Sequence, residues 1–230
     1  MMAPLETPEK QTVVIWDVWI RLFHWSLAVA VIFLLISGET GWQFFEWHRL
    51  VGEGVLVLVV FRLCWSLLGS GNASLIALIA SPRQVLHHLR GLITGKVSAE
   101  RGHNAAGGYA VLLMLALVGF QALSGLFIAD EDELINGVFF GALSSSVSEQ
   151  LYSLHLLNAH FIQAVVALHV IMVFLYLIRA GCNLIFPMLT GRMQWPVDTP
   201  LPDYKSGLTL VGLLLFGGLV LLASWLFSWW

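Results

Sequence analysis

The sequence has little charge and little cysteine. Only 11% of its 230 residues are charged, whereas a soluble domain carries about a quarter. The net charge of −3 argues against a nucleic-acid partner. The two cysteines, Cys64 and Cys182, belong to no Cys-x-x-Cys-His or Cys-x-x-Cys motif, so a covalently attached haem is excluded. The sequence also lacks a phosphate loop, a nucleotide fingerprint and a nucleophile–base motif, and no catalytic residues are predicted.

Long apolar runs fill most of the chain. Hydrophobic residues make up 58% of the sequence, and five runs are near the ~20 residues that cross a bilayer core. These predicted spans are 16–38, 49–68, 108–128, 153–178 and 207–230. We therefore predict an all-α membrane protein, with a four-helix transmembrane bundle within residues 1–196. Residues 197–230 would form a linker and a fifth transmembrane helix, in which Gly217 and Gly218 allow close helix packing.

Basic residues indicate how the chain lies in the membrane. We expect no cleaved signal, because the first residues carry Glu6 and Glu9 and no basic region. Lysines and arginines gather in segments that share one side, and only Arg49 falls on the other. Those on the shared side are Lys10, Arg21, Arg62, Arg83, Arg90, Lys96, Arg101, Arg179, Arg192 and Lys205. The positive-inside rule then predicts a cytoplasmic N-terminus and a periplasmic C-terminus in a bacterial inner membrane.

Tryptophans lie near the ends of the predicted spans, as interfacial aromatic residues do. They are Trp16, Trp19, Trp42, Trp47, Trp229 and Trp230.

Four histidines lie inside or at the ends of the predicted spans, where ionisable residues are functional candidates. His155 and His169 are 14 residues apart, so they share nearly one helix face at depths that differ by about 21 Å. His48 is level with His155, and His24 is roughly level with His169. Two facing pairs at two depths suit two bis-histidine haems, held noncovalently in a bundle core. A metal-binding or proton-transport role for these histidines is the alternative.

His160 serves as an internal control. It lies about 140° from His155 and about 180° from His169 around a helix. It cannot share their face, and we expect it to be a packing or hydrogen-bonding residue.

Two arginines could pair with haem propionates. Arg62 lies 14 residues after His48 and Arg21 one turn before His24, so both reach the level of the His24–His169 pair. Arginine suits carboxylate partners. Arg49, beside His48, is a weaker candidate for the other pair. The alternative is that all three extend to the membrane interface.

At this point the sequence resembles a known family. It is similar to the bacterial cytochrome b561 family and to the b-type cytochrome subunits of nickel–iron hydrogenases, and the membrane subunit of formate dehydrogenase follows the same scheme. The similarity runs through most of residues 14–180. The matching residues are Trp16-Asp17, Arg21-Leu-Phe-His24-Trp25, His48-Arg49-x-x-Gly52, Arg62, Trp65, Gly69-Ser70, Pro82, Gly102-His103-Asn104, Gly107, Ser124-Gly125-Leu126-Phe127, His155 and His169.

The resemblance implies the same ligands as the depth argument. His24 with His169 would hold a cytoplasmic-side haem b, and His48 with His155 an outer one. It also implies a quinone site near Gly102-His103-Asn104, with Asn104 or His103 as hydrogen-bond partner, although Asn104 also suits a helix N-cap. Two positions depart from the family pattern: Ala105 replaces a proline, and Leu156 an acidic residue. Neither removes a ligand.

The segment 129–154 carries acidic residues and no lysine or arginine. They are Asp130, Glu131, Asp132, Glu133 and Glu149. Such a patch would attract a basic docking face, so we predict electron exchange between quinone and a periplasmic c-type cytochrome or similar partner. A solvated acidic turn is the plain alternative. Two other functions remain open: the anchor subunit of a hydrogenase or dehydrogenase, and a self-contained oxidoreductase that oxidises a small species such as superoxide and reduces quinone.

Overall fold

A computed structural model describes residues 10–40, 44–94, 102–130, 135–197 and 209–229. Several residues used in the predictions lie outside these ranges, and their placement is not described. They are Glu6, Glu9, Trp42, Lys96, Arg101, Glu131, Asp132, Glu133, Lys205 and Trp230.

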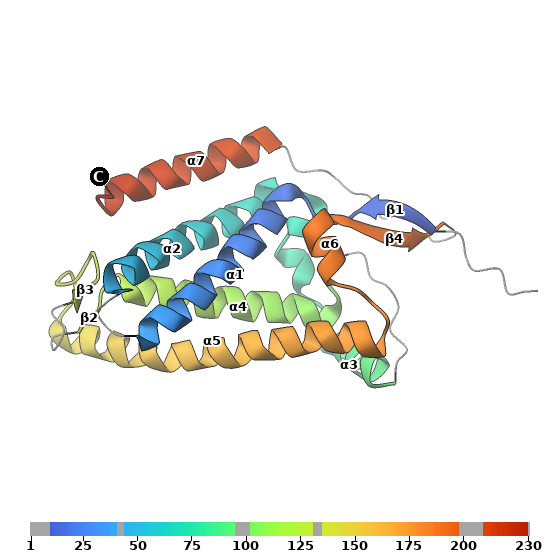
Figure 1. The fold of residues 1–230 in the computed structure, drawn as a ribbon, viewed down its shortest axis with the longest axis horizontal. Coiled ribbons are helices and arrows are strands. Elements are labelled where there is room, and N and C mark those ends of the chain that lie inside the picture. The colour runs from blue at the N-terminus through green and yellow to red at the C-terminus, as the bar shows by residue number, and fades with distance from the viewer. Residues whose placement is uncertain (1–9, 41–43, 95–101, 131–134, 198–208, 230) are drawn as a thin grey trace, which may run out of the picture.

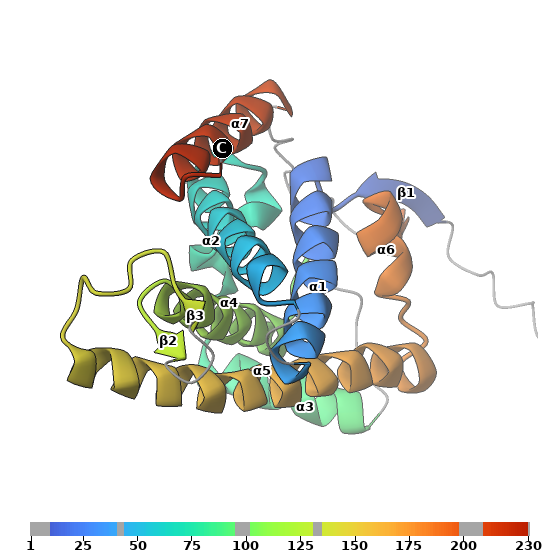
Figure 2. The same cartoon turned by 60° about the vertical axis from the view of Figure 1, so that its left-hand side comes forward.

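Five helices are long and apolar enough to cross a membrane. They are α1 (Val18–Glu39), α2 (Phe45–Leu68), α4 (Ala105–Gly125), α5 (Ser145–Arg179) and α7 (Thr209–Leu226). Figures 1 and 2 show α1, α2, α4 and α5 running together as a bundle, with α7 against the outer side of α2. Large apolar side chains are exposed on all five helices, for example Ile36, Leu67 and Ile178. An all-α, multi-pass membrane protein is therefore confirmed.

The fourth transmembrane helix, α5, is longer than its predicted span of 153–178. α5 begins at Ser145, eight residues before the predicted start at 153. Its 35 residues rise over about 52 Å, which exceeds a hydrocarbon core of about 30 Å. Most of the added residues are polar, including the exposed Ser146 and Glu149, so an apolar-run criterion does not include them.

Side chains before α1 and α4 fix where these helices begin. The Asp17 carboxylate accepts a hydrogen bond from Ile20 N at 2.8 Å, and the Asn104 side chain accepts one from Gly107 N at 2.7 Å. These are N-caps, which satisfy backbone N–H groups that a helix start leaves unpaired. The cap predicted for Asn104 is confirmed.

Shorter elements complete the chain. The amphipathic helix α3 (Pro82–Ile93) starts with a capping box formed by Ser81 and Gln84. A six-residue helix, α6 (Ile185–Thr190), follows α5. Two 3₁₀ turns, η2 (Gly71–Ala73) and η3 (Ile76–Leu78), join α2 to α3. Gly108 of α4 lies against η3 so closely that an added Cβ would come within 2.5 Å of the Leu78 carbonyl oxygen.

Two short strand pairs mark the ends of the bundle. β1 (Lys10–Val14) pairs antiparallel with β4 (Arg192–Pro196), and Thr12 lies opposite Gln194. β2 (Ala129–Asp130) pairs with β3 (Ile135–Asn136) at the other end. We call these the β1 end and the β2 end. The helices α1, α4 and α7 begin at the β1 end, and α2 and α5 finish there.

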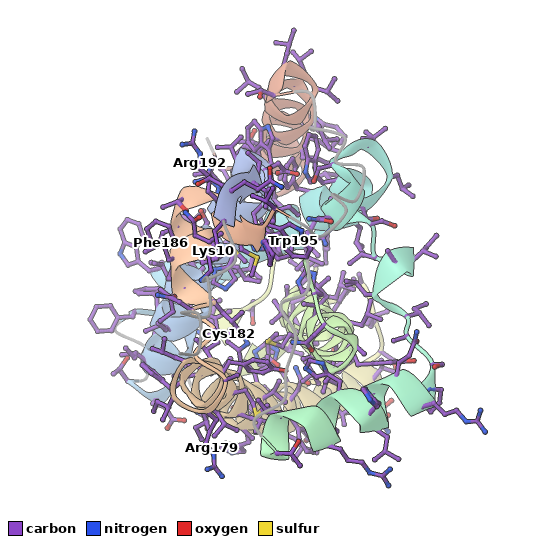
Figure 3. The ribbon with its side chains drawn as sticks, turned by 90° about the vertical axis from the view of Figure 1, so that its right-hand side faces the viewer. Lys10, Arg179, Cys182, Phe186, Arg192 and Trp195 are labelled. Carbon is purple, nitrogen blue, oxygen red and sulfur yellow. The ribbon has the colours of Figure 1, made fainter. Side chains whose placement is uncertain are left out.

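Basic residues are distributed unequally between the two ends. Among the residues that the structure describes, every lysine and arginine except Arg49 lies in the half of the molecule next to the β1 end. Figure 3 looks onto this end and labels Lys10, Arg179 and Arg192 around it. The described residues thus keep the charge asymmetry read from the sequence.

The buried Asp17 carboxylate joins α1 to the end of α2. Its Oδ2 accepts hydrogen bonds from Trp65 Nε1 at 3.2 Å and from Ser70 Oγ at 2.5 Å, in addition to its capping bond. Trp65 is fully buried, beside Phe61 and Ile20. One buried contact therefore joins three of the residues that carry the family resemblance: Asp17, Trp65 and Ser70.

The fifth transmembrane helix, α7, is attached to the bundle at both of its ends. Near the β1 end, Trp19 Nε1 donates to the Thr209 carbonyl at 3.2 Å, and a Cβ on Gly212 would clash with the Trp19 ring. Near the β2 end, Trp229 Nε1 donates to the buried Glu53 carboxylate of α2 at 2.6 Å. The prediction that Gly217 and Gly218 mediate close packing does not hold within this chain, because an added Cβ on either would have no atom within 4 Å in the described structure. Gly212 has that role.

Candidate functional site

The first histidine pair lies toward the β1 end. His24 projects from α1 and His169 from α5, and their ring centroids are 6.4 Å apart with an angle of 56° between the planes. A metal–imidazole bond is about 2 Å, as in zinc sites, so two imidazoles on opposite sides of one metal would have centroids on the order of 6–7 Å apart. The spacing of this pair fits a shared metal.

The second pair lies toward the β2 end. His48 projects from α2 and His155 from α5, and both rings are partly buried. They are close enough for a charge on one to act on the other. Each ring has a serine partner on a neighbouring helix: Ser37 Oγ lies 2.8 Å from His48 Nδ1, and Ser124 Oγ lies 2.9 Å from His155 Nδ1.

His160 faces away from both pairs. It is exposed, and its Nδ1 lies 3.4 Å from Gln163 Oε1 on the same helix. The expectation that it is a hydrogen-bonding residue outside the paired face is confirmed.

The three arginines differ in their surroundings. Arg62 is buried, with 3% of its surface exposed, and donates to the Ala73 carbonyl at 2.7 Å. It does not extend to the interface. Arg21 donates to the Leu189 carbonyl at 2.8 Å, and its Nε is buried without a hydrogen-bond partner in the described structure. Arg49 pairs with Glu46 and Glu53, each at 3.1 Å. Its charge is thus already balanced within α2.

Polar side chains gather where α4 begins. Asn104 donates from Nδ2 to Tyr176 Oη at 3.0 Å, and Tyr176 also hydrogen bonds to the buried His88 of α3. The His103 ring packs edge-on against Trp16, with centroids 4.7 Å apart. Desolvation, together with the nearby charges of Arg62 and His24, lowers the pKa of His103 to about 4. His103 is therefore neutral at physiological pH.

A model of the family described as prokaryotic cytochrome b561 matches residues 15–191, which is more than half of the chain. The chain belongs to the prokaryotic cytochrome b561 family. No curated protein matches the sequence. The resemblance noted in the sequence is confirmed, and the protein is a membrane b-type cytochrome of electron transport. The matched region contains α1 to α6 and all four paired histidines, while α7 lies beyond it.

The paired histidines of this b561 cytochrome suit haem b, which its family typically binds. A haem brings most of its iron's ligands with it, so a pair of histidines such as His24 and His169 would be enough to hold one. The ring spacing of His24 and His169 accommodates one metal. The Nδ1 of His24 is buried and lacks a hydrogen-bond partner among the described residues. Within the described ranges, no group of three or more His, Cys, Asp or Glu side chains could hold a metal ion.

Some contacts of the site were not predicted. The sequence did not lead us to predict a site role for the serines beside His48 and His155, or for Tyr176 and His88. A signal for the serines does exist. Ser-Gly occurs at 37–38 near the end of the first span and again at 124–125 near the end of the third. The histidine that each dipeptide contacts is decided by how the helices pack, which the dipeptide alone does not reveal.

Proposed function

We propose that this cytochrome holds two noncovalent b-type haems and passes electrons between membrane quinone and a redox partner outside the bacterial inner membrane. His24 and His169 would hold the haem toward the β1 end, and His48 and His155 the one toward the β2 end. Each haem would supply a one-electron iron couple. The observation that carries this proposal is the presence of two facing histidine pairs at two depths of one bundle, with centroids 6.4 Å apart in the first pair.

The proposed orientation puts the β1 end in the cytoplasm. It rests on the basic residues that surround this end, which the positive-inside rule places on the cytoplasmic side. The C-terminus, after α7, would then be periplasmic. The His48–His155 pair would lie nearer the periplasm and could exchange electrons with a partner there.

Arg21 and Arg62 would pair with the propionates of the haem toward the β1 end. The unpaired Nε of Arg21 and the deep burial of Arg62 support this role, since a buried cation needs a partner. Loss of a positive charge beside a haem favours its oxidised form. Replacing either arginine with methionine should therefore lower the midpoint potential of that haem and leave the other haem nearly unchanged.

A redox titration that resolves the two haems tests this assignment. Arg49→Met is the matched control, because Arg49 is already paired with Glu46 and Glu53. Equal potentials in all three variants and in the unmodified protein would remove the arginines from the proposal.

Quinone would bind near the start of α4. Asn104 already uses its oxygen for Gly107 and its amide nitrogen for Tyr176, so we favour His103 as the hydrogen-bond partner. His103 is neutral at physiological pH and can donate or accept. Replacing it with leucine should raise the KM for quinol more than it lowers kcat, because it removes a binding contact.

The acidic β2 end would receive a basic partner such as a c-type cytochrome. Asp130 and the exposed Glu149 are the members of this patch that lie among the described residues, whereas Glu131, Asp132 and Glu133 lie outside them. Replacing Glu131, Asp132, Glu133 and Glu149 with their amides should slow electron exchange with such a partner several-fold at low salt and reduce the dependence of the rate on salt. Replacing Glu39 and Glu46 with glutamine is the control, because it makes the same chemical change at acidic residues outside the patch. A rate that all six replacements leave unchanged would contradict docking at this patch.

The central experiment is to purify the chain in mild detergent and to measure haem per polypeptide and quinol-dependent reduction. We expect about two b-type haems per chain, reduced by quinol and reoxidised by a soluble c-type cytochrome. Co-purification with a hydrogenase or dehydrogenase subunit would favour the anchor function instead. Superoxide-driven quinone reduction by the isolated chain would favour the self-contained oxidoreductase. Folded protein without haem would overturn the proposal.

A further inference from the structure

Two contacts at the β2 end repeat the same chemistry on separate helix pairs. Ser37 of α1 reaches His48 of α2, and Ser124 of α4 reaches His155 of α5, at 2.8 and 2.9 Å from Nδ1. Both serines are buried. Each is followed by a glycine whose missing side chain would face the same ring carbon: a Cβ would lie 3.5 Å from His48 Cε1 and 3.4 Å from His155 Cε1. The two rings therefore meet their neighbouring helices in the same way.

The hydrogen-bond partners of each serine fix where the imidazole proton lies. Ser37 Oγ donates to the Leu34 carbonyl at 3.2 Å, and Ser124 Oγ donates to the Gln121 carbonyl at 3.0 Å. A hydroxyl has one hydrogen and a carbonyl can only accept, so a serine that donates to its helix carbonyl accepts from the imidazole Nδ1. Nδ1 then carries the hydrogen of the neutral ring. Nε2 keeps its lone pair, which is what a metal ligand needs.

The pair at the β1 end differs in this respect. The Nδ1 of His24 is buried and has no hydrogen-bond partner within the described ranges. The serine contact therefore distinguishes His48 and His155 from at least one ligand of the other pair.

We propose that Ser37 and Ser124 are positioning residues that hold His48 and His155 ready to bind haem iron through Nε2 and that lower the midpoint potential of that haem. This inference rests on the proposed function, in which these histidines are haem ligands. A hydrogen bond from Nδ1 to an acceptor makes the imidazole a stronger electron donor. Stronger donation stabilises ferric over ferrous iron, so the bound haem becomes harder to reduce.

A purely structural role would have a different signature. A serine that bonds to its own helix carbonyl is common in membrane helices and affects local bending and packing. Its loss would alter stability without changing the potential of one haem selectively. Ser224 of α7 is the matched control, because it is buried and donates to the Leu221 carbonyl at 2.9 Å.

The test is a redox titration, with electron paramagnetic resonance to distinguish the two haems, on the full chain with its haems bound. Ser37→Ala and Ser124→Ala should each raise the reduced-to-oxidised ratio of the haem at the β2 end, at fixed ambient potential. The change should be about threefold to tenfold, the effect of one hydrogen bond, or roughly 30–60 mV for a one-electron couple. The other haem should shift little, and Ser224→Ala should shift neither. Ser37→Thr and Ser124→Thr keep the hydroxyl and should restore the original potential.

Several results would overturn the inference. They are unchanged potentials in both alanine variants, an equal shift in Ser224→Ala, and loss of haem that threonine does not restore. Haem loss in the alanine variants that threonine does restore would support the positioning role. Failure of the proposed function would look different, since the unmodified chain would then lack the haem or His48→Ala would leave haem content unchanged.

Discussion

Replacing His169 with alanine is expected to lower the haem content from about two to about one per chain, because one of the two histidines that would hold that haem is lost. His24→Ala should have the same effect, and the double variant should lose no more than either single one. His48→Ala and His155→Ala should each likewise lower the haem content to about one per chain, and their double variant should lose no more, because both act on the second haem. The measurement is a pyridine haemochrome assay on purified protein, with circular dichroism to show that the helices remain folded.

His160→Ala is the control for these four variants. It lies on the same helix as His155 and His169 but is exposed and bonds only to Gln163 among its described contacts. Its haem content should equal that of the unmodified chain. If the His24 and His169 variants lost different haems, the pairing based on the 6.4 Å ring separation would be wrong.

Replacing Asp17 with alanine is expected to destabilise the fold more than any other single change outside the histidines. The change removes the N-cap of α1, worth about 1 kcal/mol. It also leaves the Trp65 and Ser70 donors buried without their acceptor, at about 1–3 kcal/mol each. The expected loss in the free energy of unfolding is roughly 3–5 kcal/mol, since these costs add only in part. Thermal unfolding in detergent, followed by circular dichroism, measures it.

Asp17→Asn should fall between alanine and the original residue. An amide keeps one oxygen for the cap, but its NH₂ group faces the indole N–H of Trp65, which can only donate. Glu39→Ala, at the exposed opposite end of α1, is the control and should change stability by no more than about 0.5 kcal/mol. An Asp17→Ala protein as stable as this control would show that the buried contact contributes little.

The transmembrane helices could be predicted because the bilayer imposes a length and a composition on each span. All five predicted spans correspond to observed helices. The early start of α5 could not be predicted in this way, because Ser145 to Tyr152 extend beyond the apolar run. The β1–β4 pair was also missed. Lys10 and Pro196 pair across most of the sequence, and five residues with little alternation give no local strand signal.

For the site, helical periodicity explains why the histidines could be predicted. His155 and His169 lie on one rigid helix, so their separation alone fixes their relative face and depth. The contact from Ser37 to His48, by contrast, crosses between helices, and its partner atoms are set by packing. Asp17 shows the same limit: its position before α1 suggests a cap, but Trp65 and Ser70 reach it only after α2 folds back against α1.

The attachment of α7 has a consequence for truncated forms of the chain. The residues that receive this helix, Trp19 and Glu53, lie inside the region shared with the family, whereas their partners lie beyond it. A protein cut after residue 191 would lose the Trp229 donor to one oxygen of the Glu53 carboxylate and keep Arg49 beside the other. We expect such a protein to be less stable than the full chain, and a change of position 53 to glutamine or leucine to offset part of that loss. Among related proteins, we therefore expect an acidic residue at the position of Glu53 to occur together with a helix equivalent to α7.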